Sequence, residues 1–300
     1  YNGKEIFIRK HMRKREKMRE AALRKNKLKQ LAIGIILGSV LLSACSTPVI
    51  DVADATPTVV SPTPIVPTAS PTPVPDRSLV ICVAYEPQTL YSYGSDNRSM
   101  WSILEAIYDG PIDTVGFESQ PVILEKIPDV ESGDAVLSEV ELNAGDMVQD
   151  ADGNVATLLE GTTVFPAGCM DESCAVTWDG ESPLIMKQLS LTYKLLDDLK
   201  WSDGEPLTAS DSEYAFLVAN DPETPVNRYY LNRTLSYTAA DETSVVWTGI
   251  PGFYTGQYGE LFWSPFPQHA WKDLTATELL TDPVSTTKPL GWGPYQIVKN

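Results

Sequence analysis

The stretch LLDDLKWSDGEPLTASDSEYAF (195–216) holds the clearest local structural signals in the chain. It overlaps LSLTYKLL (189–196), whose alternating apolar and polar residues predict a half-buried strand. The Asp-Gly pair at 203–204 favours a tight turn. Thr208 or Ser210 can cap the amphipathic helix that follows. A strand, a turn and a capped helix in succession predict a mixed α/β domain.

Further elements are predicted on the N-terminal side of this stretch. The apolar, β-branched run SLVICVAYEP (78–87) predicts a buried strand, in which Cys82 is a small core residue. MWSILEAIYDG (100–110) has apolar residues at helical spacing and ends in glycine, which predicts a helix. The region 112–176 is strand-like and rich in turns, and ADGN (151–154) favours a hairpin turn.

Three elements are predicted on the C-terminal side. TSVVWTG (243–249) and GPYQIVKN (293–300) are strand candidates, and HAWKDLTATELL (269–280) predicts a pair of short helices or one broken helix.

The first 45 residues have the organisation of an export signal. A basic segment up to Lys29 precedes the apolar run LAIGIILGSVLL (31–42) and the small residues before Cys45. The run is shorter than the ~20 apolar residues of a transmembrane helix. LSAC resembles the bacterial lipobox, which implies cleavage before Cys45 and attachment of lipid to it; the alternative is a short uncleaved anchor with an incidental cysteine. We therefore expect an extracytoplasmic protein, lipid-anchored to the cell membrane.

Charge and composition change sharply after residue 44. The rest of the chain has 11 basic and 37 acidic residues, close to −26, which disfavours nucleic acid as a partner. Residues 45–76 are dominated by proline and threonine, which predicts an extended, semi-rigid tether.

The cysteines and the few catalytic-looking motifs give little support to an enzyme or a metal protein. Cys169 and Cys174 bracket a short loop, and an oxidising compartment favours a disulfide over free thiols or half of a zinc site. Ser285 and Lys288 have the S-x-x-K spacing, but Pro289 disfavours the helix which that chemistry needs. We expect no enzyme activity, no cofactor and no metal.

Four segments, in order, resemble family 5 of the extracytoplasmic solute-binding proteins, the oligopeptide- and dipeptide-binding proteins of ABC importers. Segment 195–216 resembles the family pattern S/H-D-G-x-P-L/F-T-A-x-D-V and departs from it at Ser212, where the family usually has valine. AYEPQTLYSY (84–93) resembles the family's first strand and its loop, with Tyr91 in place of aspartate. The other two are SPFPQHAW (264–271), similar to a P-x-H segment, and KPLGWGPYQIVK (288–299), similar to P-x-G-T-G-P-Y/F with Trp292 at the usual threonine.

The resemblance implies an α/β, two-lobed fold of the periplasmic-binding-protein type (type II), with an extra domain inserted in the first lobe. Only the N-terminal part of such a protein is expected in this chain. The expected regions are a signal peptide (1–44), the tether (45–76), the start of the first lobe (77–110), the inserted domain with flanking lobe (111–285) and the return to the first lobe (286–300).

The function implied by the resemblance is capture of peptides or similar small solutes and their delivery to an ABC permease. Two other functions stay open, a surface hydrolase and a sensory or structural lipoprotein. Candidate ligand contacts are Tyr85 and Glu86, in the loop after the first strand, and Trp263 and Trp292, in loops rich in glycine and proline. The tryptophans could equally pack a junction between domains, and Glu86 could cap its loop.

Overall fold

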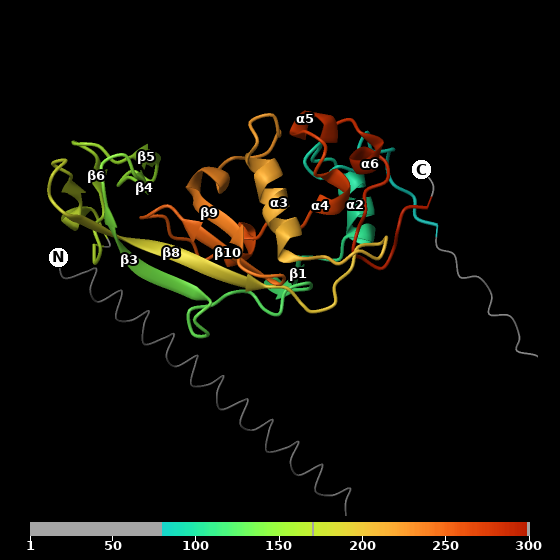
Figure 1. Cartoon of the computed structure of the whole chain (residues 1–300), viewed down its shortest axis with the longest axis horizontal. Coiled ribbons are helices and arrows are strands. Elements are labelled where there is room, and N and C mark those ends of the chain that lie inside the picture. Colours follow the sequence, from blue (N-terminus) through green and yellow to red (C-terminus); the bar gives the residue numbers. More distant parts are fainter. Residues whose placement is uncertain (1–79, 170, 299–300) are drawn as a thin grey trace, which may run out of the picture. The chain divides into compact units, whose positions relative to one another are not determined.

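A four-stranded antiparallel sheet forms the centre of the fold in the computed structural model, which describes residues 80–169 and 171–298 (Figure 1). The predicted signal, Cys45 and the tether lie outside these residues. The predicted strands 189–196 and 243–249 are confirmed as β8 and β10. The strands in spatial order are β3 (Ala135–Leu142), β8 (Leu184–Lys194), β10 (Ser244–Gly249) and β9 (Thr234–Ala239).

Strand β8 is buried on opposite faces in its two halves. Its second half buries Leu189, Leu191 and Tyr193, whereas its first half buries Leu184 and Met186. Successive side chains of a strand point to opposite faces, so the change from even to odd positions places one core on each side of the sheet. The pairing of β8 with β3 continues through this change without a shift of register.

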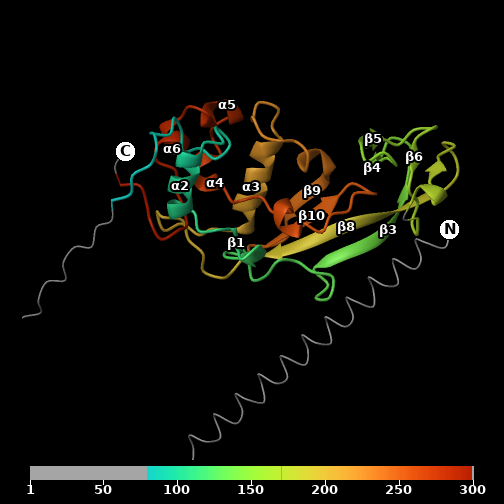
Figure 2. The same cartoon turned by 180° about the vertical axis from the view of Figure 1, so that it is seen from behind.

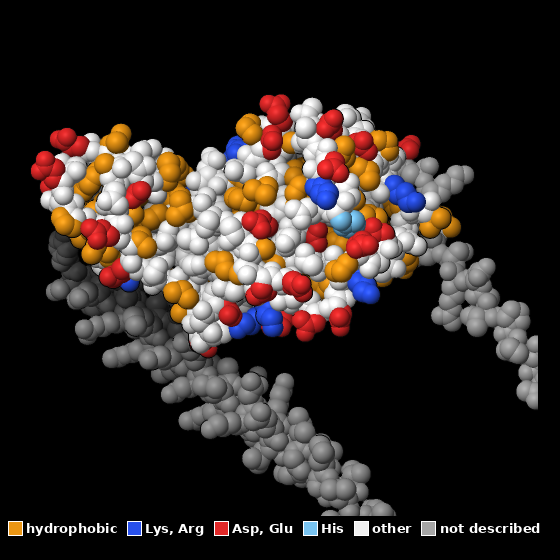
Figure 3. Space-filling model, in the orientation of Figure 1, with side chains coloured by type: hydrophobic (Ala, Val, Ile, Leu, Met, Phe, Trp, Pro, Cys, Tyr) orange, Lys and Arg blue, Asp and Glu red, His pale blue; other side chains and the backbone are white. Residues whose placement is uncertain are grey.

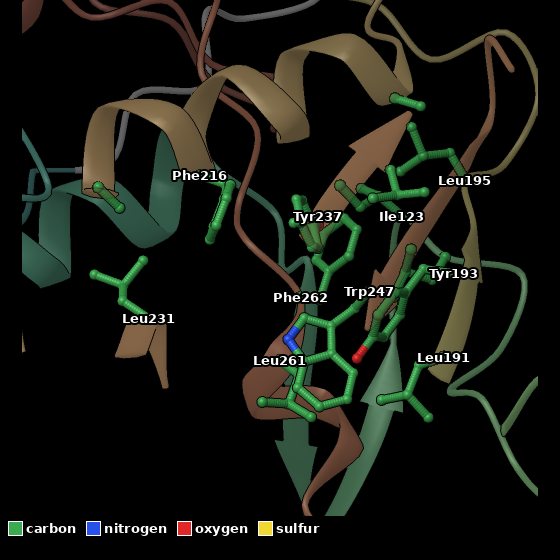
Figure 4. Close-up of a cluster of buried hydrophobic side chains, with 14 of the residues drawn as sticks. Ile123, Leu191, Tyr193, Leu195, Phe216, Leu231, Tyr237, Trp247, Leu261 and Phe262 are labelled. Atoms are coloured by element: carbon green, nitrogen blue, oxygen red, sulfur yellow. The ribbon is translucent and has the colours of Figure 1, made fainter. Parts of the chain in front are cut away.

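The larger core lies between the sheet and α3 (Ala209–Asn220), which packs on β9 and β10. Trp247 is fully buried there, and its indole nitrogen donates a hydrogen bond to Thr234 Oγ1 at 2.8 Å. Figure 4 shows Trp247, Tyr237 and Phe216 pointing into the same cluster from the sheet and the helix. The predicted capped helix is confirmed, with Thr208 as its N-cap.

The smaller core belongs to residues 140–186, which we call the β-extension. It contains two short hairpins, and the predicted turn at 151–154 is confirmed between β4 and β5. A disulfide joins Cys169 and Cys174 in the loop before β7. The elements are β4 (Met147–Gln149), β5 (Val155–Thr157), β6 (Thr163–Val164), a 3-10 turn (Glu172–Cys174) and β7 (Val176–Thr177); the core residues are Leu142, Val148, Leu158, Val164, Trp178, Leu184 and Met186.

Short helices gather at the other end of the sheet, as Figure 2 shows from behind. The predicted helix 100–110 is confirmed as α2, and the predicted helix pair in 269–280 as α4 and α5. In the ranges that the structure describes, no helix has the length and apolar character needed to cross a membrane. The remaining bounds are α2 (Arg98–Ile107), β1 (Ile112–Val115), β2 (Glu118–Pro121), 3-10 turns (Leu231–Arg233 and Tyr258–Leu261), α4 (Gln268–Trp271), α5 (Ala276–Leu279) and α6 (Pro283–Thr286).

Two predicted strands are wrong for the described residues. Neither 80–87 nor 293–298 forms a strand, and Val80 is 85% exposed. Cys82, expected in the core, is an exposed free thiol. The physical reason is the same in both segments: a strand needs a hydrogen-bonded neighbour, and neither segment lies beside one in the described chain.

Candidate ligand-binding site

The carboxylate of Asp211, in the first turn of α3, fastens three segments together. It is 4% exposed and accepts hydrogen bonds from the Thr208 amide (2.8 Å), the Trp201 indole (3.3 Å) and the Gln268 amide (3.0 Å). Burial raises the pKa of Asp211, and these donors act against the rise by stabilising the charged form. Through these hydrogen bonds Asp211 holds the turn after Trp201, the start of α3 and the start of α4 in one arrangement.

Two glycines bring the segment 288–293 directly against the end of α2. A side chain at Gly291 would meet the Ile107 carbonyl oxygen, and the Gly293 amide donates to that oxygen at 2.7 Å. Only glycine permits so close an approach of two backbones. Trp292, between them, is thereby placed on Tyr108 with ring centroids 4.7 Å apart, and its indole donates to the Asp109 carbonyl at 2.9 Å.

An apolar cleft opens beside Trp292, with a volume of ≈ 120 Å³. Its walls come from the loop before α2, from α2 itself and from the turn before α4. Five of the eleven lining residues are aromatic, so the cleft offers large apolar contact area with few directional demands. The lining residues are Ser92, Tyr93, Trp101, Leu104, Glu105, Tyr108, Gly110, Ser264, Pro265, Phe266 and Trp292.

The electrostatics of the cleft are simple. Glu105, exposed on α2, is the one charged residue in its lining. Burial raises the pKa values of the Tyr93 and Tyr108 phenols far above neutrality, so both stay protonated at physiological pH. Trp101 is 42% exposed and leaves part of its ring open to a ligand. The cleft can hold an apolar group and present one carboxylate at its edge.

The four predicted ligand contacts lie in different surroundings. Trp292 lines the cleft. Trp263 instead packs on Phe216 and Tyr237, each with centroids 4.9 Å away, which is the packing alternative considered for it from the sequence. Tyr85, 57% exposed, and Glu86 lie in the irregular segment before α2 and are not part of the cleft lining.

Trp101, Tyr108 and Phe266 were not identified as site residues from the sequence. Trp101 and Tyr108 belong to the apolar pattern that predicts α2, and such a pattern indicates a buried face rather than a cleft. One signal could have separated Trp101 from the rest: on the helix it lies about 90° to one side of the buried Met100, Leu104 and Ile107, at the edge of the buried face.

Ser285 of the S-x-x-K motif and His269 both have structural roles. Ser285 is fully buried, and its hydroxyl donates to the carbonyl oxygens of Leu279 (2.7 Å) and Asp282 (2.9 Å). His269 Nε2 lies 2.9 Å from Asp203 Oδ2, linking α4 to the turn after Trp201. In the described part of the chain no three His, Cys, Asp or Glu side chains are placed to hold a metal ion.

Comparison with known proteins identifies a curated relative and similar solved structures. The chain is 26% identical over 127 residues to the oligopeptide-binding protein OppA of Lactococcus lactis subsp. lactis, and the match covers 35% of this chain and 21% of that protein. The chain is also similar in structure to an oligopeptide-binding protein of Thermus thermophilus with a pentapeptide and to AppA of Bacillus subtilis with a nonapeptide. It spans about a third of the length of each of these proteins. The first has TM-score 0.47 and 18% identity and covers 70% of this chain and 33% of that chain; the second has TM-score 0.45 and 15% identity and covers 71% and 32%.

The family model of the bacterial extracellular solute-binding proteins, family 5 (middle), matches residues 187–300. The matched part contains β8 from Lys187 onward, the Asp211 contacts, α3 and the two glycines around Trp292. The match also agrees with the α/β class expected from the sequence. On these grounds residues 187–300 are similar to the middle part of family 5 of the bacterial extracellular solute-binding proteins.

Proposed function

We propose that the chain forms part of a membrane-anchored extracytoplasmic receptor that captures peptides or similar small solutes and delivers them to an ABC permease. Within it, the aromatic cleft receives an apolar side chain of the ligand. The observation that carries this proposal is the cleft itself, in which Trp101, Tyr108 and Trp292 surround an apolar volume. The oligopeptide-binding name of the Lactococcus relative supports peptides as the ligand class.

A binding role agrees better with this chemistry than hydrolysis does. Acyl or glycosyl transfer needs a nucleophile or a pair of carboxylates with a base in reach. Around the cleft the titratable groups are Glu105 and two tyrosines that burial keeps protonated. We therefore propose no catalytic residue, cofactor or metal for this site.

The test is calorimetric titration of the whole chain with the pentapeptides AAFAA and AADAA. We expect AAFAA to bind more tightly, because its phenyl ring can enter the cleft. Trp101→Ala should weaken AAFAA binding about tenfold, since an aromatic contact and its buried area are lost. Trp292→Phe keeps an apolar wall and should weaken binding less.

Phe117→Ala provides the matched control, because Phe117 is a fully exposed aromatic outside the cleft, on the turn between β1 and β2. Its affinity should equal that of the original chain. Equal affinities for both peptides, or no difference between Trp101→Ala and Phe117→Ala, would remove the cleft from the proposal.

Tyr85 and Glu86 remain proposed contacts of the ligand outside the cleft. Both belong to the segment that leads into the loop before α2. Tyr85→Ala should weaken binding of AAFAA and AADAA by the same factor, because a contact outside the cleft does not sense the central side chain. A loss confined to AAFAA would instead place Tyr85 with the cleft.

Anchoring is proposed through Cys45, which follows the small residues of the predicted signal. Cys45→Ala should release the protein from membranes or leave it unprocessed, as measured by fractionation and by mass spectrometry of the N-terminus. Normal processing together with unchanged membrane association would contradict this part of the proposal.

A further inference from the structure

Strand β3 forms one edge of the central sheet and is paired on one side only. It runs antiparallel to β8 along all of its length, Ala135–Leu142. Figure 1 shows it as the outermost strand of the sheet, with no helix of the described residues along its free side. Among the residues that the structure describes, no second strand pairs with it.

The hydrogen-bond alternation identifies which groups of β3 face outward. The Thr192 amide donates to the Asp134 carbonyl at 2.8 Å, so this opposed pair is of the hydrogen-bonded kind. In an antiparallel ladder the kinds alternate, and the amides and carbonyls of Leu137, Glu139 and Glu141 therefore turn to the free edge. They form a row of three donors and three acceptors for an added strand.

The side chains along this edge combine apolar and acidic character. Val136 and Leu137 are 49% and 47% exposed, and Glu139 and Glu141 follow them, both exposed. Glu139 has a long ion pair with Lys187, at 3.6 Å, whereas Glu141 forms no ion pair within the described residues. The lysine, proline or bulge that often protects an edge strand is absent from β3 itself.

The charged residues of the β-extension are all acidic. The β-extension, which continues from β3, has nine acidic residues and no lysine or arginine. Red side chains mark its outer end in Figure 3. This arrangement disfavours a second copy of the chain: an antiparallel pair of β3 strands centred on Glu139 would place two Glu139 carboxylates directly opposite each other, which is repulsive.

We propose that the free edge of β3 binds an extended segment of a partner protein as an added strand, and that this segment carries lysine or arginine opposite Glu139 and Glu141 and an apolar residue opposite Leu137. Main-chain hydrogen bonds to the three outward residues hold the segment, and the acidic pair selects its charge and register. The edge belongs to a surface distinct from the aromatic cleft, so occupation of one does not require the other.

The test uses fluorescein-labelled KVKTVV, which is complementary to β3 in an antiparallel pair, and EVETVV as its charge-reversed counterpart, titrated into the whole chain by fluorescence anisotropy. KVKTVV should bind and EVETVV should not. The double variant E139K/E141K should weaken KVKTVV about tenfold, because two attractive cross-strand pairs become repulsive. E139Q/E141Q, which cannot repel, should show an intermediate loss.

The matched control is E172K/E181K, which reverses two exposed charges of the β-extension away from β3. It should leave KVKTVV binding unchanged. Hydrogen exchange gives the second readout: KVKTVV should slow the amides of Leu137, Glu139 and Glu141, while those of Val136, Ser138 and Val140 are already protected by β8. Three results would overturn the proposal. They are an equal loss of KVKTVV affinity in E139K/E141K and E172K/E181K, equal binding of KVKTVV and EVETVV, and no added amide protection when KVKTVV is present. Protection of the same amides at high protein concentration without peptide would identify a second copy as the occupant instead.

Discussion

The two cores that share β8 are stabilised in different ways. The larger core between the sheet and α3, which we call the body core, contains twenty buried residues and is held by buried polar groups, with Asp211 joining Trp201 to α3 and α4. The core of the β-extension has seven buried residues, and its own loop is closed by the Cys169–Cys174 disulfide. A small apolar core contributes little stability by itself, and a covalent link compensates by restricting the unfolded chain.

The family match covers part of the body core. The matched segment begins at Lys187, immediately after the β-extension, and includes the polar contacts of the body. The β-extension lies outside it. Helix α2, with the cleft residues Trp101 and Tyr108, also lies outside it.

The largest effect is expected in the body core. Trp247→Ala removes a fully buried indole and leaves Thr234 Oγ1 without its donor, and it should lower the free energy of unfolding by about 3–5 kcal/mol. Urea denaturation followed by circular dichroism measures this change. A loss below about 1 kcal/mol would mean that Trp247 is not central to the core.

Leu158→Ala tests whether the two cores are independent. Leu158 is fully buried in the β-extension, and its truncation should cost about 3 kcal/mol of local stability. Hydrogen exchange should show faster opening of β4 to β7, with unchanged protection of Leu191 and Tyr193 in the second half of β8. Loss of protection in both halves would show that the cores unfold together.

The disulfide provides a smaller effect in the same region. Replacing Cys169 and Cys174 by serine should cost about 2 kcal/mol, because the closed loop is short. Peptide mapping without reductant should find the two cysteines linked. Alkylation of both cysteines in the native, unreduced protein would contradict the bond. Faster hydrogen exchange in the body core of the double serine variant would contradict a local role of the bond.

Ser212 tests the polar fastening of the body. Its buried hydroxyl lies 2.7 Å from Tyr237 Oη and also donates to the Trp263 carbonyl oxygen. Ser212→Val, which restores the residue usual in the family pattern, should cost about 1–2 kcal/mol because it removes these hydrogen bonds. Ser212→Ala separates loss of the bonds from steric crowding. A stabilised valine variant would show that the bonds contribute nothing net.

The smallest effect concerns Asp203 and His269. Burial raises the pKa of Asp203, but hydrogen bonds from His269 and the Glu205 amide outweigh it, and the net pKa lies below the usual value. A lowered carboxyl pKa stabilises the fold above about pH 4 and loses this contribution as the pH falls through the folded pKa. Both side chains are about a third exposed, so the contribution should be under ~1 kcal/mol.

The measurement is the difference in unfolding free energy between the original chain and His269→Ala, taken at pH 6 and at pH 3. We expect a small difference at pH 6 that vanishes at pH 3. A difference that grows toward low pH would have the wrong sign for this ion pair.

The elements with complete local signals were predicted well from the sequence. Thr208 and the following pattern define α3, and the Asp-Gly turn at 152–153 defines the β4–β5 hairpin, because capping and turn chemistry act within a few residues. The strands expected at 78–87 and 293–300 are not formed by their described residues, since a strand requires a partner that composition does not reveal. The change of buried face within β8 was not predicted either, because it depends on the two cores that lie on either side of this strand.

The site was predicted in part. Trp292 stood out because glycines flank it, and the structure explains both glycines by their approach to Ile107. Trp101 and Phe266 were missed because the cleft combines α2 with a turn more than 150 residues later, and no local pattern carries that contact. Trp263 has a similar loop composition to Trp292, yet its ring joins the core, so loop position alone does not distinguish a wall of a cleft from packing.

The most direct test of the central claim is the set of indole signals in ¹⁵N–¹H NMR spectra of the whole chain titrated with AAFAA. The chain has seven tryptophans, which serve as internal controls for one another. If the aromatic cleft is the ligand site, the signals of Trp101 and Trp292 shift on titration while those of Trp178 and Trp247, buried in the two cores, stay in place. Binding of AAFAA that leaves Trp101 and Trp292 unshifted would contradict the account.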